Sequence, residues 1–206
     1  MFFESLSGGR NEQEDKIRTS YSRLAPAIRL MLKSRNTYTL PVRKADLEAT
    51  ASDPHTHIGM DAHAIDFVVP EGSVVRAAAP GKIIFIKIDS DQGGDDSVYE
   101  NFKFYNHIVV KHDNGEYTEY GHLKFHGANR KVGDTVNAGD VIGYSGNTGH
   151  SEKPHLHFSV FVLEKMKPDF EKLPPSKKYF INDADFGFTT IQPHFKVPDP
   201  QASNQP

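Results

Sequence analysis

Beyond about Thr37, the sequence consists of short runs rich in β-branched and aromatic residues, interrupted by Gly, Pro, Asn and Asp. This texture is typical of an all-β domain, because the turns between strands need residues that tolerate sharp backbone bends. We therefore predict a mainly β fold for this part of the chain. Six runs are predicted to be strands: Val74 to Ala78, Lys82 to Ile88, His107 to His112, Glu116 to His122, Val141 to Tyr144 and His155 to Leu163.

The tripeptide Asp113-Asn114-Gly115 lies between the third and fourth of these runs. Asn-Gly tolerates the positive φ angles that tight hairpins require. The two flanking runs are therefore predicted to form a β-hairpin.

Two segments share Gly, Val and Ala at the same offsets, Gly72 to Ala77 and Gly133 to Ala138. Each is followed by another glycine, Gly81 or Gly139, and then by an apolar run. The shared order of turn and strand favours two related β units packed together. We therefore predict an internally duplicated domain of the β-sandwich or barrel-like kind.

An amphipathic helix is predicted before the β-rich part, from Asn11 to about Ser34, with a strained position at Pro26. Its apolar residues recur at steps of three and four: Ile17, Tyr21, Leu24, Ile28 and Met31. The expected organisation is an N-terminal helical extension over residues 1–36, a β-rich domain over 37–165, and a C-terminal extension and tail over 166–206.

Composition excludes several classes of protein. The 206 residues, 37% hydrophobic and 25% charged, fit one globular domain with extensions, and no apolar run approaches the roughly 18 residues of a transmembrane helix. The net charge of −3 and the lack of a basic cluster interleaved with aromatics make nucleic acid an unexpected partner. There are no cysteines, so a bound metal must be held by His, Asp or Glu.

Among the eleven histidines, His155 and His157 stand out because they lie two apart in a predicted strand. Alternate strand residues share a face, so both imidazoles are expected on one side and Leu156 and Phe158 on the other. The pair could place a metal ligand beside a proton-transfer group, or could be two surface histidines on a polar face. The glycine-rich segment Gly143 to Gly149 favours the first interpretation, because it suits close approach by an extended substrate.

Five short motifs occur in a fixed order along the chain. They are His57-Ile58-Gly59 with Ala64-Ile65-Asp66-Phe67, Pro70-Glu71-Gly72, Tyr120-Gly121-His122-Leu123, Ser145-Gly146-Asn147-Thr148-Gly149 and Pro154-His155-Leu156-His157-Phe158. In this order they resemble the motifs of peptidase family M23, the LytM-like or lysostaphin-like zinc peptidases. The resemblance runs from about His57 to Phe161, roughly half of the chain. It implies a β-rich, internally duplicated sandwich and a metallo-endopeptidase that cleaves the peptide cross-links of bacterial peptidoglycan.

The resemblance also implies roles for individual residues. One zinc ion would be bound by His57, Asp66 and His157, and a catalytic zinc with three protein ligands keeps a fourth position for water. His122 and His155 would handle protons or stabilise charge. Zinc lowers the pKa of bound water from about 16 toward 7, so one of these histidines would accept its proton and the other would steady the oxyanion. Which histidine acts as the base stays open.

The aspartate ligand has a competitor. Family members commonly place it four residues after the first histidine, a spacing that Asp61 offers. Asp66 is preferred because Phe67 follows it and because it lies four residues before Pro70-Glu71-Gly72, as the aspartate does in the family. Asp61 remains the reserve candidate.

Three further features are the alternative histidine ligands, the residue at position 159 and an acidic segment. His55 and His63 are close enough to substitute for His57, but only His57 has the following Ile-Gly of the motif. Ser159 stands where many family members have Glu, outside the implied ligand set. Asp89 to Asp96 resembles a calcium loop in composition but lacks the EF-hand spacing, and is predicted to be a mobile loop at the rim of a cleft.

The remaining histidines match no ligand motif and are predicted to be structural or exposed: His107, His112, His126, His150 and His194.

Two other functions are weighed against the peptidase. M23-like domains that have lost zinc ligands can act as binding or activator modules for cell-wall hydrolases, but candidates for all three ligands are present here. A carbohydrate phosphocarrier-like domain would use a histidine without needing an aligned aspartate. The resemblance implies a location in the cell envelope or outside the cell, although no secretory signal is visible at Met1 to Ser5. A monomer is expected.

Overall fold

The computed structural model describes residues 33–52, 57, 61–163 and 188–196. These residues form strands and two 3₁₀ helices, and none of them lies in an α-helix, so the predicted mainly β fold is confirmed. The elements are β1 Lys33–Tyr38, β2 Ala49–Ala51, β3 Ile65–Val68, β4 Val74–Arg76, β5 Gly81–Lys87, β6 Gly93–Gly94, η2 Ser97–Glu100, η3 Phe102–Phe104, β7 His107–Lys111, β8 Tyr117–Gly121, β9 Leu123–Ala128, β10 Thr135–Val136, β11 Val141–Ser145, β12 Gly149–His150, β13 His155–Leu163, β14 Phe188–Thr190 and β15 Gln192–Phe195.

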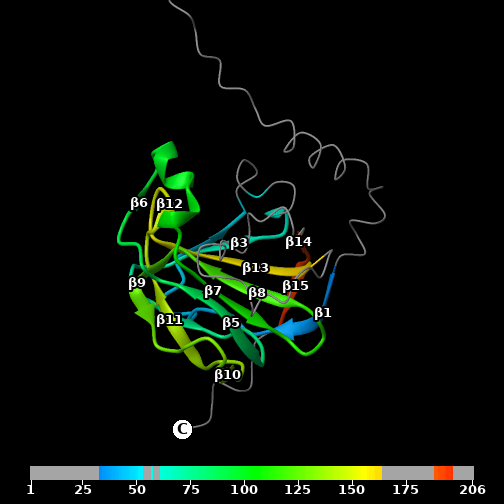
Figure 1. The fold of residues 1–206 in the computed structure, drawn as a ribbon. Coiled ribbons are helices and arrows are strands. Elements are labelled where there is room, and N and C mark those ends of the chain that lie inside the picture. Colours follow the sequence, from blue (N-terminus) through cyan, green and yellow to red (C-terminus); the bar gives the residue numbers. More distant parts are fainter. Residues whose placement is uncertain (1–32, 53–56, 58–60, 164–187, 197–206) are drawn as a thin grey trace, which may run out of the picture. The chain divides into compact units, whose positions relative to one another are not determined.

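The main sheet has eight strands and runs through the centre of the domain (Figure 1). Its order is β10-β5-β7-β8-β13-β3-β2, with β14 paired to β13. All of its pairings are antiparallel, so the side chains of neighbouring strands line up in rows across each face. One face of β13 is apolar, because Leu156, Phe158 and Val160 are fully buried.

A second sheet, β4-β11-β9, packs against this apolar face. Gly143 of β11 comes so close to the main sheet that a Cβ there would lie 3.5 Å from Ile108 of β7. The Tyr120 hydroxyl accepts a hydrogen bond of 2.8 Å from the backbone N–H of Ala78, which follows β4. This part of the core therefore lies between the two sheets. The opposite face of β13 carries His155 and His157 at one end and Phe161, which belongs to a second buried cluster, at the other.

The two similar segments found in the sequence exchange strands. Strand β4 of the first pairs with β11, which follows the second, and β10 of the second pairs with β5, which follows the first. Gly72 and Gly133 open the two segments with φ angles of 85° and 97°. This reciprocal pairing agrees with the predicted internal duplication.

All six predicted strands are confirmed, with ends that shift by at most two residues, and His155–Leu163 has the predicted bounds. The predicted hairpin is confirmed as well. The backbone N–H of His112 donates to the carbonyl of Glu116 at 2.9 Å, and Gly115 has a φ angle of 82°.

Residues on both sides of the predicted 37–165 domain also form strands. The predicted helix lies outside the described residues except at its end, where Lys33 and Ser34 already belong to β1. Strand β1 pairs in parallel with β15, and β14 extends β13, so residues 33–36 and 188–195 belong to the β domain. Strands β1 and β15 pair across more than 150 residues and leave no local signal, and β14 has only three residues, which is why these strands were missed.

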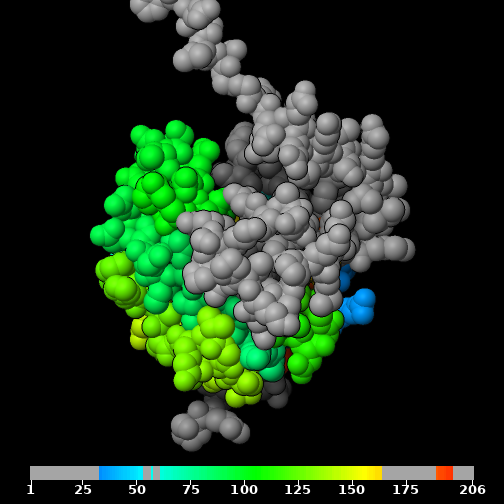
Figure 2. Space-filling model, in the orientation of Figure 1, coloured from blue at the N-terminus to red at the C-terminus, as the bar shows by residue number. Residues whose placement is uncertain are grey.

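The segment predicted to be a mobile loop at Asp89 to Asp96 contains strand β6, which pairs in parallel with β12. Further backbone hydrogen bonds join Gly149 to Gln92 at 3.0 Å and Ser151 to Gly94 at 2.9 Å. This segment is therefore tied to the glycine-rich stretch that precedes β13. The adjoining η2 and η3 helices, which have no buried residues, stand out from the domain at the upper left (Figure 2).

Glu116 joins the hairpin to β1. Its carboxylate is only 3% exposed and accepts hydrogen bonds of 2.7 Å from the Ser34 hydroxyl, the Arg35 backbone N–H and the Tyr38 hydroxyl. Burial opposes ionisation, but these hydrogen bonds prevail and hold the pKa of Glu116 below its usual value. The charged carboxylate therefore stabilises the fold.

We expect Glu116→Ala to lower the free energy of unfolding by about 2–4 kcal/mol, because it leaves the buried Tyr38 hydroxyl and two partly buried donors without their acceptor. Chemical denaturation at pH 7 measures the change, with the exposed neighbour Asp113→Ala as a control that changes stability little. Because the folded pKa lies below the unfolded one, the contribution is complete above about pH 4.5 and is lost as the pH falls through the folded pKa. Equal stability of the two variants would contradict this role.

Candidate metal centre

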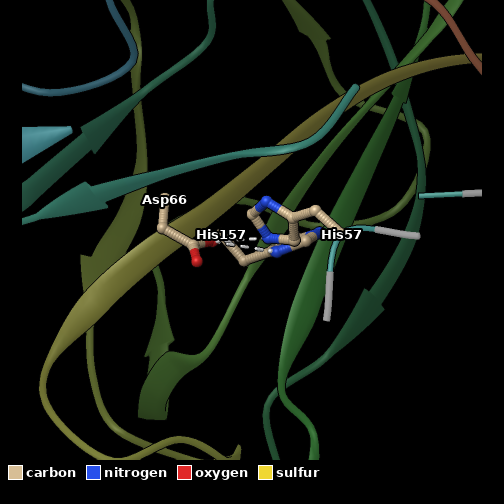
Figure 3. A group of neighbouring side chains, drawn as sticks. All are labelled: His57, Asp66 and His157. Carbon is tan, nitrogen blue, oxygen red and sulfur yellow. Dashed lines mark hydrogen bonds and ion pairs between the residues drawn. The ribbon is translucent and has the colours of Figure 1, made fainter. Parts of the chain in front are cut away.

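The register between β3 and β13 brings two of the predicted ligands together. Asp66 stands directly opposite His157 in this antiparallel pair. Directly opposed residues point to the same face of a sheet, so both side chains lie on the face of β13 that is turned away from the core. His57, from the segment before β3, reaches the same place (Figure 3). One ligand atom from each of these residues lies within 4.8 Å of the others.

The distances suit a small divalent metal. His157 Nδ1 lies 3.1 Å and His57 Nε2 lies 3.3 Å from the same oxygen of Asp66. Ligands about 2.0 Å from a tetrahedral metal are separated from one another by about 3.3 Å. Two imidazoles and one carboxylate also match the donor types of catalytic zinc sites. The three residues therefore fit a metal with little rearrangement.

Electrostatics around this group favour a charged aspartate. Burial would raise the pKa of Asp66, but hydrogen bonds from His157 and His57 hold it well below its usual range. Burial would likewise lower the pKa of His157, yet the hydrogen bond to Asp66 and the charges of Asp61 and Glu119 raise this pKa to about 9. Without a metal, a proton therefore occupies His157 at neutral pH.

His122 lies beside this group, at the end of β8. Its ring centroid is 4.4 Å from that of His155 and 6.0 Å from that of His157. Its Nδ1 lies 2.7 Å from the carbonyl oxygen of Thr148, which can only accept, so Nδ1 carries the proton in the neutral ring. Burial and the neighbouring histidines hold the pKa of His122 well below its usual value. Nε2 is then free to accept a proton.

His155 has the same arrangement. Its Nδ1 lies 2.8 Å from the carbonyl oxygen of Lys153 and 3.2 Å from the Ser151 hydroxyl, while Nε2 lies 3.7 Å from Asp66 Oδ1. Burial lowers the pKa of His155, although the charge of Asp66 opposes the change. His122 and His155, here called the auxiliary histidines, therefore both have an unprotonated Nε2 at neutral pH.

The alternative ligands lie differently. Asp61 is not in the group that could hold a metal, which among the described residues consists of His57, Asp66 and His157. Burial raises the pKa of Asp61, against the opposing effect of His157. The backbone N–H of His63 donates to the Thr190 hydroxyl at 3.2 Å. His55 lies outside the described residues.

A buried polar pair near the site was not predicted from the sequence. His107 and Glu119 are 2% and 1% exposed and lie within hydrogen-bonding distance of each other. Tyr105 packs its ring edge against both His107 and His122, with centroid distances of 4.9 Å. Glu119 also stands opposite Ser159 in the register, so a carboxylate occurs beside this position although residue 159 is Ser. Alternate residues of β8 share a face, so Glu119 lies on the face of Gly121, which is paired with His157. This two-residue period in the sequence could have placed Glu119 near the site.

The other histidines are buried and bonded or exposed, as predicted. His112 is 2% exposed and bonds the Pro80 carbonyl at 2.7 Å and the Thr118 hydroxyl at 3.0 Å. His126, His150 and His194 are exposed.

Comparison with known families identifies the chain. The model of peptidase family M23 matches residues 61–168, slightly more than half of the sequence. The chain therefore belongs to peptidase family M23. The matched segment contains Asp66, His122, His155 and His157, and His57 lies four residues before it.

Curated relatives share this region. The chain is 38% identical over 102 residues to glycyl-glycine endopeptidase ALE-1 of Staphylococcus capitis, covering 48% of this chain and 24% of the relative. It is 37% identical over 98 residues to DD-carboxypeptidase/endopeptidase Mpg of Neisseria meningitidis (48% and 19%) and 32% identical over 97 residues to peptidoglycan DD-endopeptidase ShyA of Vibrio cholerae (47% and 19%). The chain thus spans about a quarter or less of the length of these relatives.

Among solved structures, a zinc-containing peptidase from Vibrio cholerae superposes with a TM-score of 0.45 at 27% identity, over 61% of this chain and 36% of that one. Among the described residues, no helix is long and apolar enough to cross a membrane.

We expect metal binding at pH 7 to release about one proton, because the pKa of His157 is about 9 in the metal-free protein and the proton must leave Nδ1 before a metal binds. The apparent affinity should rise about tenfold per pH unit from pH 7 and level off near pH 9. Titration calorimetry with zinc in buffers of different ionisation enthalpy measures the released proton. His150→Ala, which changes an exposed histidine outside the group, should release the same number. Binding heats that do not depend on the buffer would contradict the assignment.

Proposed function

We propose that this chain is a zinc-dependent endopeptidase that cleaves peptide cross-links of bacterial peptidoglycan. One observation carries the proposal: His57, Asp66 and His157 converge within 4.8 Å in a chain of peptidase family M23, with the rings of two further histidines alongside. Metal ligands beside neutral histidines are the combination that metal-assisted hydrolysis needs.

His57 Nε2, a carboxylate oxygen of Asp66 and His157 Nδ1 would hold the zinc ion. Zinc bound there would polarise the scissile carbonyl and make a water molecule acidic enough to attack it near neutral pH. The three residues leave one tetrahedral position for that water, which distinguishes a catalytic site from a structural one. The aspartate also compensates part of the metal charge.

His122 and His155 would divide proton transfer and charge stabilisation. Each donates Nδ1–H to a backbone carbonyl and keeps Nε2 unprotonated. The neutral histidine that faces the water would accept its proton at Nε2 and deliver it to the leaving amine. The other ring would take up a proton from solvent at Nε2 as negative charge develops, and would then donate a hydrogen bond to the oxyanion.

The substrate class is supported by the relatives. ShyA is named a peptidoglycan endopeptidase and ALE-1 a glycyl-glycine endopeptidase, so family members with a similar domain act on different peptide bonds. We propose a peptidoglycan peptide as the substrate and the cell envelope or the exterior of the cell as the location. The chain would act as a monomer.

The loss of a single ligand tests the enzyme. We expect His157→Ala to lose stoichiometric zinc and to slow peptidoglycan cleavage by at least about 100-fold, because zinc activates the nucleophile. Metal analysis and release of peptides from purified peptidoglycan measure the two effects, and the exposed His150→Ala is the control that retains both. A wild type without zinc and without cleavage would refute the proposal and leave the non-catalytic activator as the better function. Undiminished cleavage by His157→Ala would instead refute zinc catalysis at this site.

A matched pair of variants tests the choice of aspartate. Asp66→Asn should reduce zinc affinity by at least about tenfold, because it removes a charged ligand within 3.3 Å of both histidines. Asp61→Asn should change zinc affinity less, because Asp61 is outside the group. Competition with a chelator measures both affinities. Loss of zinc in Asp61→Asn alone would make Asp61 the ligand.

A further inference from the structure

We infer that Thr148 and Asn106 are positioning residues that hold His122 for proton transfer, an inference that rests on the proposed function. Neither residue belongs to the metal group. Both are buried, with Thr148 5% and Asn106 0% exposed. Both bind the backbone of the next residue, Leu123, and Thr148 also binds the ring of His122.

The backbone of His122 needs such support. Its φ angle is 55°, in the left-handed region that residues with a side chain rarely occupy. An unfavourable conformation of this kind persists only where the surrounding structure enforces it. The position of His122 at the end of β8 therefore depends on contacts outside the strand.

The contacts fall on Leu123, the next residue. Its backbone N–H donates to the carbonyl of Asn106 at 3.0 Å. Its carbonyl oxygen accepts hydrogen bonds from the Thr148 hydroxyl at 2.8 Å and from Asn106 Nδ2 at 3.2 Å. Both backbone groups of Leu123 are thereby fixed. The peptide that follows His122 cannot rotate without breaking the bond from Leu123 N–H to Asn106, and the next peptide is held by Thr148 and Asn106 Nδ2.

Thr148 also controls the imidazole. Its carbonyl oxygen lies 2.7 Å from His122 Nδ1, and its hydroxyl accepts a hydrogen bond of 3.2 Å from the Asn106 backbone N–H. Thr148 thus links the ring of His122 to the hydrogen bonds that hold Leu123. Since a carbonyl can only accept, this link selects the tautomer with the proton on Nδ1 and leaves Nε2 unprotonated.

Asn106 connects Leu123 to Ser90, in the segment that follows β5. Its side chain accepts a hydrogen bond from the Ser90 backbone N–H at 3.0 Å and donates to the Ser90 carbonyl at 2.7 Å. With the bond to Leu123, both amide hydrogens and the amide oxygen of Asn106 are used. A fully buried and fully bonded amide specifies one geometry, so it can place a neighbour accurately.

The test compares Thr148→Val with Thr148→Ser. Valine has the shape of threonine without the hydroxyl, whereas serine keeps the hydroxyl. We expect Thr148→Val to lower kcat on peptidoglycan peptides by about 10- to 100-fold, part of the 10²- to 10⁴-fold that a positioned acid or base contributes. KM and zinc content should stay near wild type, and Thr148→Ser should keep most of kcat.

A second measurement reports on positioning directly. Nitrogen-15 NMR of histidine-labelled full chain gives the protonated ring nitrogen, and His122→Gln identifies the signal of His122. Wild type should carry the proton on Nδ1. Thr148→Val keeps the backbone carbonyl but loses the two hydroxyl hydrogen bonds that hold Thr148 in place, so a second tautomer of His122 should appear. If Thr148→Val fails to fold, Asn106→Ser removes the Nδ2 donor to Leu123 and should shift the tautomer in the same direction.

The outcomes separate the two claims. Two results in folded Thr148→Val would overturn the positioning role, both with an unchanged tautomer of His122. One is a kcat within about twofold of wild type, and the other is a fall in kcat that only follows the loss of stability. A wild type without peptidase activity would refute the proposed function. The NMR comparison would then still decide whether Thr148 orients His122.

Discussion

The arrangement of the site depends on the register of one antiparallel strand pair, β3 with β13. The register sets Asp66 opposite His157, and the two-residue period of β13 adds His155 to the same face. The alternate residues, Phe67 and Phe158, are buried in the core with rings 6.0 Å apart. A slip of one residue would exchange these two faces, burying the charged group and exposing the aromatics. The hydrophobic core therefore fixes the ligand geometry.

Other parts of the domain reinforce this register from a distance. Phe195 of β15 contacts both Phe67 and Phe158, with ring centroids about 6 Å apart. The Glu116 carboxylate binds β1, the partner of β15, to the hairpin that continues into β8. Thr148 of the glycine-rich segment and Lys153, just before β13, supply the carbonyl groups that bind His122 and His155. Two of the three proposed ligands, Asp66 and His157, therefore lie on strands that the core positions, whereas the histidines proposed for proton transfer are oriented by loop carbonyls.

The sequence was sufficient for features with a local or periodic signal. Alternation placed His155 and His157 on one face, and Asn114-Gly115 identified the hairpin. The preference for Asp66 over Asp61 came from the resemblance to family M23. The pairing of β1 with β15 was missed because each strand is short and their partners are remote. Thr148 and Lys153 were missed as contacts because they act through backbone carbonyls, which every residue type has. Glu119 was missed because its burial depends on tertiary packing.

The measurement that tests the central claim most directly is the position of zinc in crystals of the zinc-loaded protein, from anomalous scattering at the zinc absorption edge. A single peak about 2 Å from His57 Nε2, an Asp66 oxygen and His157 Nδ1 is the expected result. A zinc ion bound through Asp61, or one held by His122 and His155, would contradict the division between metal ligands and proton-transfer residues on which this account rests.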